Sequence, residues 1–254
     1  MRKNTRVFGP LVGFVVCLSI VLLSSFAVAQ EEQQLNQYFS IEVKSGMGSE
    51  FENFIKNELN PALRKGGVTE MSVWTTAVFG KPGHYVITQQ VKNLSQYDQP
   101  NPLLKALGEK GFAEMMVKIQ KYVQNIDISL VVMRPDLGIE VSPDYVPKLV
   151  VQVRIDVAPG RTADYEKGAK EVMAVVKKTN AKGAYAAKVL LGGNPNEYHA
   201  VVLLDSFTDM DRYAEAFSKG MAEANLTPMS GVITRLEYRV YSYLPELGIQ
   251  APAQ

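Results

Sequence analysis

The chain has 254 residues, of which 46% are hydrophobic and 21% are charged, a composition typical of a globular protein and not of a disordered or fibrous one. Its 27 basic and 26 acidic residues give a formal net charge of +1. Three of the basic residues lie within the first six positions, so residues 30–254 carry a net charge of about −2. Because the chain has no basic segment that could serve as an electrostatic footprint, no nucleic-acid partner is expected.

The first 29 residues have the features of a secretory signal peptide. The basic start is followed by an apolar run, Leu11–Leu23, and Ala27-Val28-Ala29 has the small residues that signal peptidase recognises. This run is shorter than the roughly 20 residues that span a bilayer, so we expect cleavage before Gln30, with a retained membrane anchor as the alternative. The sequence therefore predicts a soluble periplasmic or extracellular protein with no stable membrane association after cleavage.

The only cysteine, Cys17, lies inside the apolar run of the leader. The mature chain then contains no cysteine, although it would enter a compartment in which disulfide bonds form. Its stability must come from packing.

The rest of the chain contains an internal repeat. Residues 38–46 align without gaps with residues 152–160, at an offset of 114 positions. Near the other end of each copy, Pro135-Asp136-Leu137-Gly138-Ile139 recurs as Pro245-Glu246-Leu247-Gly248-Ile249. Two matched ends indicate a duplicated unit.

Both copies show the same succession of strand and helix patterns. Alternation of apolar and polar residues indicates the strands, and apolar residues at spacings of three, four and seven indicate the helices. In the first copy the expected order is a strand at 38–43, a helix at 51–59, strands at 71–79 and 84–91, a helix at 112–123 and a strand at 126–133. In the second copy it is a strand at 152–157, a helix at 165–176, strands at 187–191 and 199–207, a helix at 213–221 and a strand at 235–243. This order predicts an α+β fold with two tandem ferredoxin-like βαββαβ modules, at 36–139 and 147–249.

A ferredoxin-like sheet carries helices on one face and needs cover on the other. The second faces of several predicted strands are polar, with Tyr38, Ser40, Glu42, Gln152, Arg154, Asp156, Glu237, Arg239 and Tyr241. We expect these faces of the two modules to meet in an intrachain, barrel-like pair. The chain then needs no second subunit to cover its sheets, and homo-oligomerisation stays open.

This element order, with the strand-to-helix junctions Val43-Lys44-Ser45-Gly46-Met47 and Val157-Ala158-Pro159-Gly160-Arg161, resembles the dimeric α/β-barrel superfamily. Within it, the chain is similar to tandem antibiotic-biosynthesis-monooxygenase-like and NIPSNAP-like modules, and the resemblance covers about residues 38–249. Members of the superfamily include cofactor-free oxygenases, haem-degrading enzymes and relatives of haem peroxidases. The resemblance therefore implies the fold, and it implies no single activity.

Trp74 is the only tryptophan, in a predicted strand that carries Thr76 on the same side. It is either an aromatic residue of the core or the wall of a pocket in which a flat apolar ligand stacks. Met115 and Met116, on the second predicted helix of the first copy, would form another wall of that pocket. The resemblance implies that an oxygenase-like member would carry, together with such a tryptophan, an asparagine near the end of the first strand. Residues 40–44 of this chain contain no asparagine.

The chain has only two histidines, His84 and His199, at comparable starts of third strands. Neither a histidine pair nor a cysteine pair has metal-ligand spacing, so no metal site is expected. A single histidine can hold haem, but in haem-binding relatives the resemblance places it on the second helix, where this chain has none. We therefore expect strand-edge histidines, with haem ligation as the alternative, and we keep both as candidate ligand-binding residues.

Arg154, Asp156, Glu237 and Arg239 form alternating charged sets on two strands that neighbour each other in the predicted sheet. A cross-strand ionic lattice that seals the two sheets explains them, with a catalytic carboxylate and an arginine clamp as the alternative. Arg154 and Arg239 are accordingly candidate ligand contacts.

No hydrolase nucleophile motif, phosphate-binding loop or dinucleotide fingerprint occurs in the sequence. We therefore expect an exported protein that binds a small apolar or aromatic molecule between sheet and helices, without a cofactor. The alternative is a cofactor-independent monooxygenase-like enzyme, for which no acid–base constellation stands out, so catalytic residues stay unassigned.

Overall fold

The structure of the protein is a computed structural model that describes residues 34–142 and 145–250, all within one compact unit. The expected signal peptide, residues 1–29, lies outside the described residues. None of the helices in the described ranges has both the length and the apolar character that a membrane span requires.

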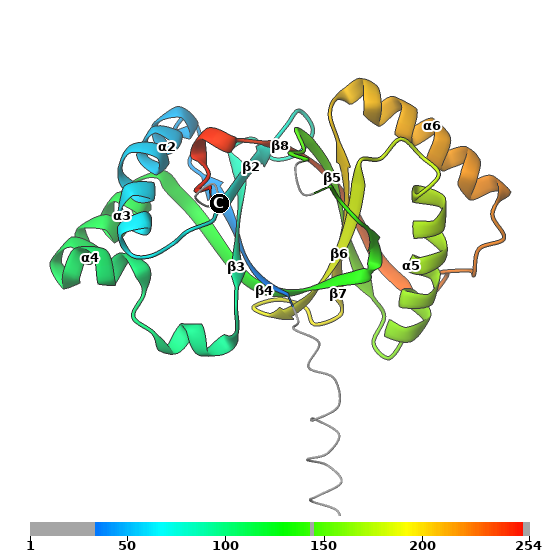
Figure 1. Cartoon of the computed structure of the whole chain (residues 1–254), viewed down its shortest axis with the longest axis horizontal. Helices are drawn as coiled ribbons and strands as arrows, with labels where there is room; N and C mark the ends of the chain where they lie inside the picture. Colours follow the sequence, from blue (N-terminus) through cyan, green and yellow to red (C-terminus); the bar gives the residue numbers. More distant parts are fainter. Residues whose placement is uncertain (1–33, 143–144, 251–254) are drawn as a thin grey trace, which may run out of the picture. The chain divides into compact units, whose positions relative to one another are not determined.

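Eight antiparallel strands form a closed barrel (Figure 1). The strands are β1 (Leu35–Val43), β2 (Ser72–Thr76), β3 (His84–Val91), β4 (Val123–Ile139), β5 (Leu149–Val157), β6 (Gly183–Leu191), β7 (Glu197–Leu204) and β8 (Ile233–Tyr243). Around the barrel they follow the order β1-β3-β2-β8-β5-β7-β6-β4, so β1 to β4 of the first half and β5 to β8 of the second half are each contiguous. The expected α+β class and the barrel are confirmed, and the module boundaries at 36–139 and 147–249 stay a prediction.

The helices lie outside the barrel, those of the first half on one side and α5 and α6 of the second half on the opposite side, whereas the C-terminal η3 lies beside the helices of the first half (Figure 1). They are α2 (Gly48–Phe54), the π-helical η1 (Ile55–Leu59), α3 (Asn60–Lys65), the 3-10 helix η2 (Leu94–Asp98), α4 (Pro102–Tyr122), α5 (Thr162–Val176), α6 (Phe207–Glu223) and the 3-10 helix η3 (Pro245–Leu247). Side-chain caps define two of the starts, because Asn101 accepts from the Leu103 N–H and Ser206 accepts from the Asp209 N–H.

The two strand-to-helix junctions that match in sequence also match in backbone geometry. Gly46 and Gly160 have φ angles of 79° and 78°, in the left-handed region that glycine adopts without a steric cost. In both junctions the helix begins two residues later, at Gly48 and Thr162. The repeated glycine is therefore a requirement of the turn.

Most strands differ from their predicted bounds, and only β3 agrees with them at both ends. β4 continues to Ile139 because its second part leaves β1 and pairs with β6. β6 begins at Gly183, four residues before its expected start, because its first residues are mostly small and show no clear alternation of apolar and polar side chains. β7 begins at Glu197, two residues before the expected start at His199.

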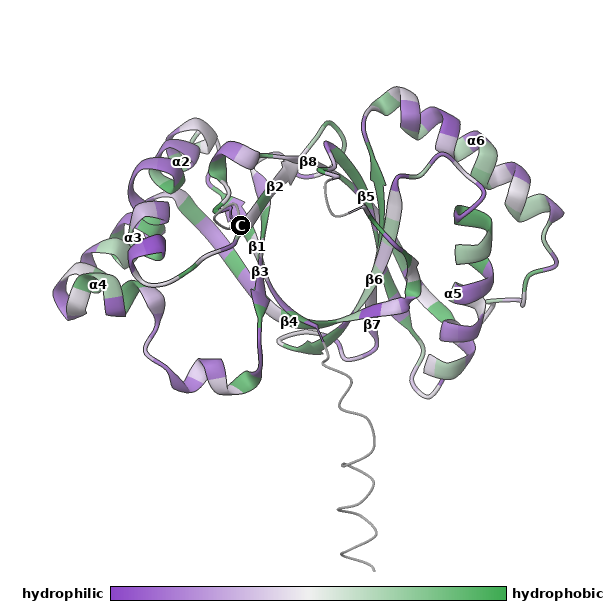
Figure 2. Ribbon diagram, viewed as in Figure 1, coloured by the Kyte–Doolittle hydropathy of each residue, from purple (hydrophilic) through white to green (hydrophobic). Residues whose placement is uncertain are grey.

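The outer faces of the strands form the core beneath the helices. In the first half Val73 and Ile87 pack with Phe51, Phe54 and Ile55 from the helical segments above them. The hydropathy colouring shows the hydrophobic residues along β5 and β6 and the mixed character of α5 and α6 outside them (Figure 2). Amphipathic helices on an alternating sheet account for this half-buried pattern.

The recurrent segments Pro135–Ile139 and Pro245–Ile249, which we call the first and second arms, each pack on the opposite half of the molecule. Leu137 of the first arm is 1% exposed, in the core of the second half. Leu247 of the second arm is 3% exposed, in the core of the first half. Each half therefore completes the core of the other.

Backbone contacts hold both arms in place. Ile139 pairs with Ala184 of β6, and Ile249 exchanges two 2.8 Å hydrogen bonds with Met71 next to β2. At Gly138 and at Gly248, an added Cβ would lie 2.9 Å from a carbonyl oxygen of the opposite half. The glycine of the recurrent motif thus permits the close backbone approach that the exchange of arms needs.

Candidate functional site

The polar strand faces expected from the sequence line the inside of the barrel. On β1, Tyr38 and Ser40 point opposite to Phe39 and Ile41, which pack under the helices. On β5 and β8 the inward positions face one another in register, with Arg154 opposite Glu237 and Asp156 opposite Arg235. One end of the barrel interior is therefore charged.

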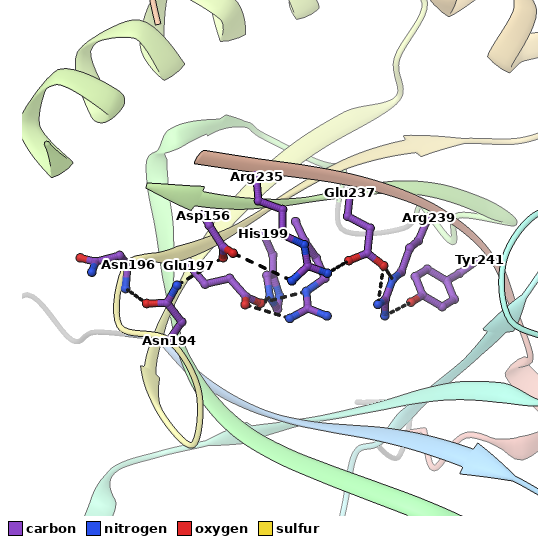
Figure 3. A network of polar contacts seen from close by, with 10 residues as sticks. Asp156, Asn194, Asn196, Glu197, His199, Arg235, Glu237, Arg239 and Tyr241 are labelled. Atoms are coloured by element: carbon purple, nitrogen blue, oxygen red, sulfur yellow. Dashed lines mark hydrogen bonds and ion pairs between the residues drawn. The ribbon is translucent and has the colours of Figure 1, made fainter. Parts of the chain in front are cut away.

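Ion pairs connect the charged side chains on the inner side of β5, β7 and β8 (Figure 3). Arg154 donates to the Glu197 carboxylate from Nε at 3.0 Å and from Nη2 at 2.8 Å. Glu237 accepts from Arg239 Nε at 2.7 Å and also contacts Arg235. All three strands belong to the second half. The ion pairs therefore connect neighbouring strands within that half, and they do not bridge the two sheets as the predicted lattice would.

A contact between Tyr241 and His84 carries the network to the first half. Tyr241 of β8 lies 3.4 Å from His84 Nδ1, and the other ring nitrogen of His84 lies 2.8 Å from Ser40 Oγ. Burial and, to a smaller extent, the positive charge of Arg239 lower the pKa of His84 to about 4, so the ring is neutral. His84 is thus a buried, fully hydrogen-bonded histidine within the barrel.

Glu197, which sequence reasoning did not single out, holds the second histidine. Its Oε1 lies 2.6 Å from His199 Nε2. Burial raises the pKa of Glu197, but the hydrogen bonds from His199 and Arg154 outweigh that effect and leave the pKa at about 2. The carboxylate is therefore ionised. The signal in the sequence was the spacing of two between Glu197 and His199, which puts both on one strand face.

The two histidines do not occupy equivalent positions. His84 pairs with Glu42, as Glu197 pairs with Asp156, so His84 corresponds in register to Glu197. Two residues further along the strand, His199 pairs with Arg154 as Val86 pairs with Ser40, so His199 corresponds to Val86. The Glu197–His199 pair is consequently a feature of the second half alone.

The middle of the barrel is filled by side chains. A cavity of about 20 Å³ remains there, which is room for about one water molecule. Its walls are Tyr38, Trp74, Val86, Thr88, Val150, Gln152, Tyr185, Val201 and Tyr241. Burial raises the pKa of Tyr185 to about 12 and also raises that of Tyr38, so both phenols stay neutral.

The structure separates the residues that the sequence placed in one pocket. Trp74 points into the barrel, where its ring centroid lies 4.6 Å from that of Tyr243. Met115 is buried in the core on the opposite face of the sheet, with Met116 beside it on α4 only partly buried. Thr76 pairs with Tyr241 at the end of β2. Trp74 and Met115 therefore do not wall a common pocket.

A haem does not fit at either histidine. His84 and His199 are 5% and 6% exposed, and the cavity inside their barrel is far smaller than a porphyrin. Within residues 34–142 and 145–250, no cluster of three metal-ligating side chains occurs either.

A larger hollow, of about 190 Å³, lies on the outside of the barrel beside η2. We call it the groove. It is lined by Gln37, Leu94, Tyr97, Ile128, Ser129, Leu130, Leu191 and Gly192. Its large apolar side chains are partly open to solvent, because Leu94, Tyr97, Ile128 and Leu191 are between 48% and 54% exposed.

The turn after β6 shapes one side of the groove. Gly192 has a φ of 77°, and an added Cβ would lie 2.2 Å from the carbonyl oxygen of Ile128. Only glycine allows this approach of the turn to β4. Sequence reasoning missed the groove, although leucines at Leu94 and Leu191, next to turns where polar residues are usual, were its signal.

Comparison with known proteins identifies relatives by structure and not by sequence. No family model matches the chain, and no curated protein matches its sequence. A protein provisionally named a monooxygenase, from Fusobacterium nucleatum, superposes with a TM-score of 0.58 at 10% identity, over 85% of this chain and 94% of that one. Another protein that is provisionally named a monooxygenase, from Lactobacillus acidophilus, superposes with a TM-score of 0.55 at 12% identity, over 88% of this chain and 99% of that one.

A chlorite dismutase from Candidatus Nitrospira defluvii also superposes, with a TM-score of 0.53 at 8% identity, over 88% of this chain and 97% of that one. At these identities the likeness shows the fold alone. The chain therefore shares with these proteins an α+β fold in which helices surround an antiparallel barrel.

Proposed function

We propose that the protein binds a small apolar or aromatic molecule in the groove beside η2. The observation that carries this proposal is the hollow of about 190 Å³ whose walls are mainly leucine, isoleucine and tyrosine side chains. The groove lies on the helix-bearing side of the sheet, between its outer face and η2. This position supports the expectation that a ligand binds between sheet and helices, but the residues that line the groove are not those that the sequence predicted.

The size and chemistry of the groove limit the ligand. An apolar cavity of about 150 Å³ holds one benzene molecule, so the groove suits a molecule of one or two rings. Gln37, Ser129 and Tyr97 place a few polar groups at its walls, the arrangement that orients ligands in apolar sites. Burial raises the pKa of Tyr97, so its phenol stays neutral and can donate a hydrogen bond.

Binding is favoured over the enzymatic alternative, a cofactor-independent monooxygenase. The residues that line the groove include no histidine, carboxylate or amine that could move a proton. Relatives of similar fold that are provisionally named monooxygenases support small-molecule chemistry on this scaffold, without locating it in this chain.

Ligand-observed NMR with toluene and indole tests the proposal on the mature chain. We expect binding of both probes, and at least tenfold weaker binding to Leu191→Asp, because a carboxylate in the groove opposes an apolar ligand. Leu236→Asp is the matched control, since Leu236 is 49% exposed on β8, outside the groove. Equal loss in both variants, or no binding by the natural chain, would overturn the proposal.

We also propose that the chain is exported and cleaved before Gln30. The basic start, the apolar run and Ala27-Val28-Ala29 support this. N-terminal sequencing of protein from the periplasm should begin at Gln30, and a product that retains Arg2 would contradict cleavage.

A further inference from the structure

The first part of strand β8 is paired on one side only. β8 pairs with β5 along almost its whole length. On the other side, β2 pairs with Tyr241–Tyr243, and the Ala77 N–H donates to the Val240 carbonyl at 3.0 Å. No described strand pairs with residues 233–239 on this side, which we call the free edge.

Backbone groups point out of the free edge at every second residue. In an antiparallel strand the N–H and C=O of one residue face one neighbour, and those of the next residue face the other. Because the Val240 carbonyl faces β2, the backbone groups of Tyr238, Leu236 and Thr234 face the free edge. A row of such donors and acceptors is a template for a further strand.

Side chains along the free edge are open to solvent. On the outer face of the barrel, Leu236 is 49% exposed and Tyr238 is 68% exposed. On the inner face, the side chains of Arg235 and Glu237 are 55% and 29% exposed and contact each other (Figure 3). Charges at an edge oppose pairing with a strand that cannot match them. The order of these charges therefore selects the partner.

The charge order of the free edge is complementary to itself. Leu236 is the middle residue of 233–239, so a second copy that pairs antiparallel about a twofold axis at Leu236 covers the whole edge. In this register Arg235 lies opposite Glu237 of the second copy, and Glu237 lies opposite Arg235 of the second copy. Opposite charges directly across two strands stabilise their pairing.

Other twofold registers are less favourable. An axis at Arg235 or at Glu237 places like charges directly opposite each other, which destabilises a strand pair. An axis at Tyr238 extends the pairing to Val240, whose carbonyl already accepts from Ala77. The axis at Leu236 avoids both conflicts.

The equivalent stretch of the first half lacks this charge order. By register with β1 and β5, Asn125 and Asp127 of β4 correspond to Arg235 and Glu237 of β8. Two β4 edges would place Asn125 opposite Asp127, with no cation in the pair. A β4 edge against a β8 edge would form one arginine–carboxylate pair, where two β8 edges form two. Pairing of β8 with β8 is therefore favoured.

We propose that two copies of the chain associate through the free edge of β8, antiparallel and in the register centred on Leu236. The pairing continues the sheet of one barrel into that of the other. It also brings Leu236 and Tyr238 of both copies together on the outer face, where they are exposed in the single chain. A contact through one short strand is small, so we expect a dissociation constant of about 100 μM.

Sedimentation velocity of the mature chain, from about 10 μM to 1 mM, measures the association. We expect monomer and dimer without larger species, because a twofold contact closes on itself. Arg235→Glu and Glu237→Arg each place like charges opposite each other, so either change should weaken dimerisation at least tenfold. The variant with both exchanges restores opposite charges in reversed order and should dimerise again. A merely structural loss would not be rescued in this way.

Asp127→Arg, the same kind of charge reversal at the equivalent position of β4, is the matched control and should leave dimerisation unchanged. Circular dichroism checks that each variant is folded. Amide hydrogen exchange should slow at Leu236 and Tyr238 as the concentration of the natural chain rises. No dimer at 1 mM, no rescue by the double exchange, or equal weakening by Asp127→Arg, which would indicate a β4–β8 contact, would overturn the proposal.

Discussion

Two buried side chains inside the barrel make stability depend on pH in the acidic range. The pKa of His84 is lowered from 6.5 to about 4, first by burial and then by Arg239. The pKa of Glu197 is lowered from 4.5 to about 2, because hydrogen bonds from His199 and Arg154 outweigh the opposing effect of burial. In both cases the unfolded chain binds the proton more tightly, so acid favours unfolding.

The signs define the expected pH windows. The contribution of His84 is complete above its unfolded pKa of 6.5 and is lost as the pH falls toward 4. That of Glu197 is complete above 4.5 and is lost as the pH falls toward 2. Each contributes about 2 to 3 kcal/mol. Urea unfolding at several pH values between 7.5 and 3 should show both losses, and the Glu197→Gln variant should lack the lower one.

Trp74→Phe should destabilise the protein. Trp74 lines the small cavity of the barrel, and its ring centroid lies 4.6 Å from that of Tyr243. The smaller ring of phenylalanine would enlarge this cavity and lose packing contacts. We expect a loss of about 1 to 2 kcal/mol in the free energy of unfolding, measured with urea. Toluene, the probe for the groove, should leave the emission of this single indole unchanged. A response of the emission to toluene, with an unchanged stability of the variant, would instead make Trp74 a ligand contact.

At the scale of elements, the arms carry more stability than their short length indicates. Leu247 is 3% exposed in the core of the first half, next to Asn60, whose side-chain amide donates to the Leu247 carbonyl at 2.9 Å. Leu247→Ala leaves a cavity there and should cost about 2 to 5 kcal/mol. Leu236→Ala, at a position 49% exposed on β8, is the control and should cost less than about 1 kcal/mol. Equal costs would mean that the second arm does not complete this core.

The strands and helices could be predicted because each has one buried face. Alternation in Phe39, Ile41 and Val43 marked β1 in this way, and the repeat indicated which strands are equivalent. The arms were visible as a recurrent motif, but no periodicity told which half receives Leu137. That choice depends on the pairing of β4 with β6, a contact between distant parts of the chain.

The candidate sites were harder to predict for the same reason. The groove joins η2, β4 and the turn after β6, three segments that are far apart in sequence. His199 was a candidate from its residue type alone, whereas Glu197 became visible only when the true start of β7 was known. Trp74 and Met115 were assigned to one pocket because the sequence did not show on which face of the sheet each lies.

At the scale of the whole molecule, the two halves depend on each other. Residues 34–141 alone lack Leu247 in their core and have no partner for the inner face of β1 to β4. We expect this fragment to be unfolded or dimeric, and to form a folded pair when it is mixed with residues 145–254. Size-exclusion chromatography with light scattering, together with circular dichroism, distinguishes these states. A stable folded monomer of the fragment would contradict the exchange of arms.

The register match of Val86 with His199 has a consequence for how such a barrel can change. In a barrel built from two identical chains, every substitution occurs twice, so a histidine inside the barrel would be accompanied by a second one across the dyad. Two imidazoles with their carboxylates and arginines would crowd a space that leaves only about 20 Å³ empty. In a single covalent chain the two equivalent positions can carry different residues. One side of the nearly symmetric interior can therefore be polar, with His199, while the other side keeps the apolar Val86.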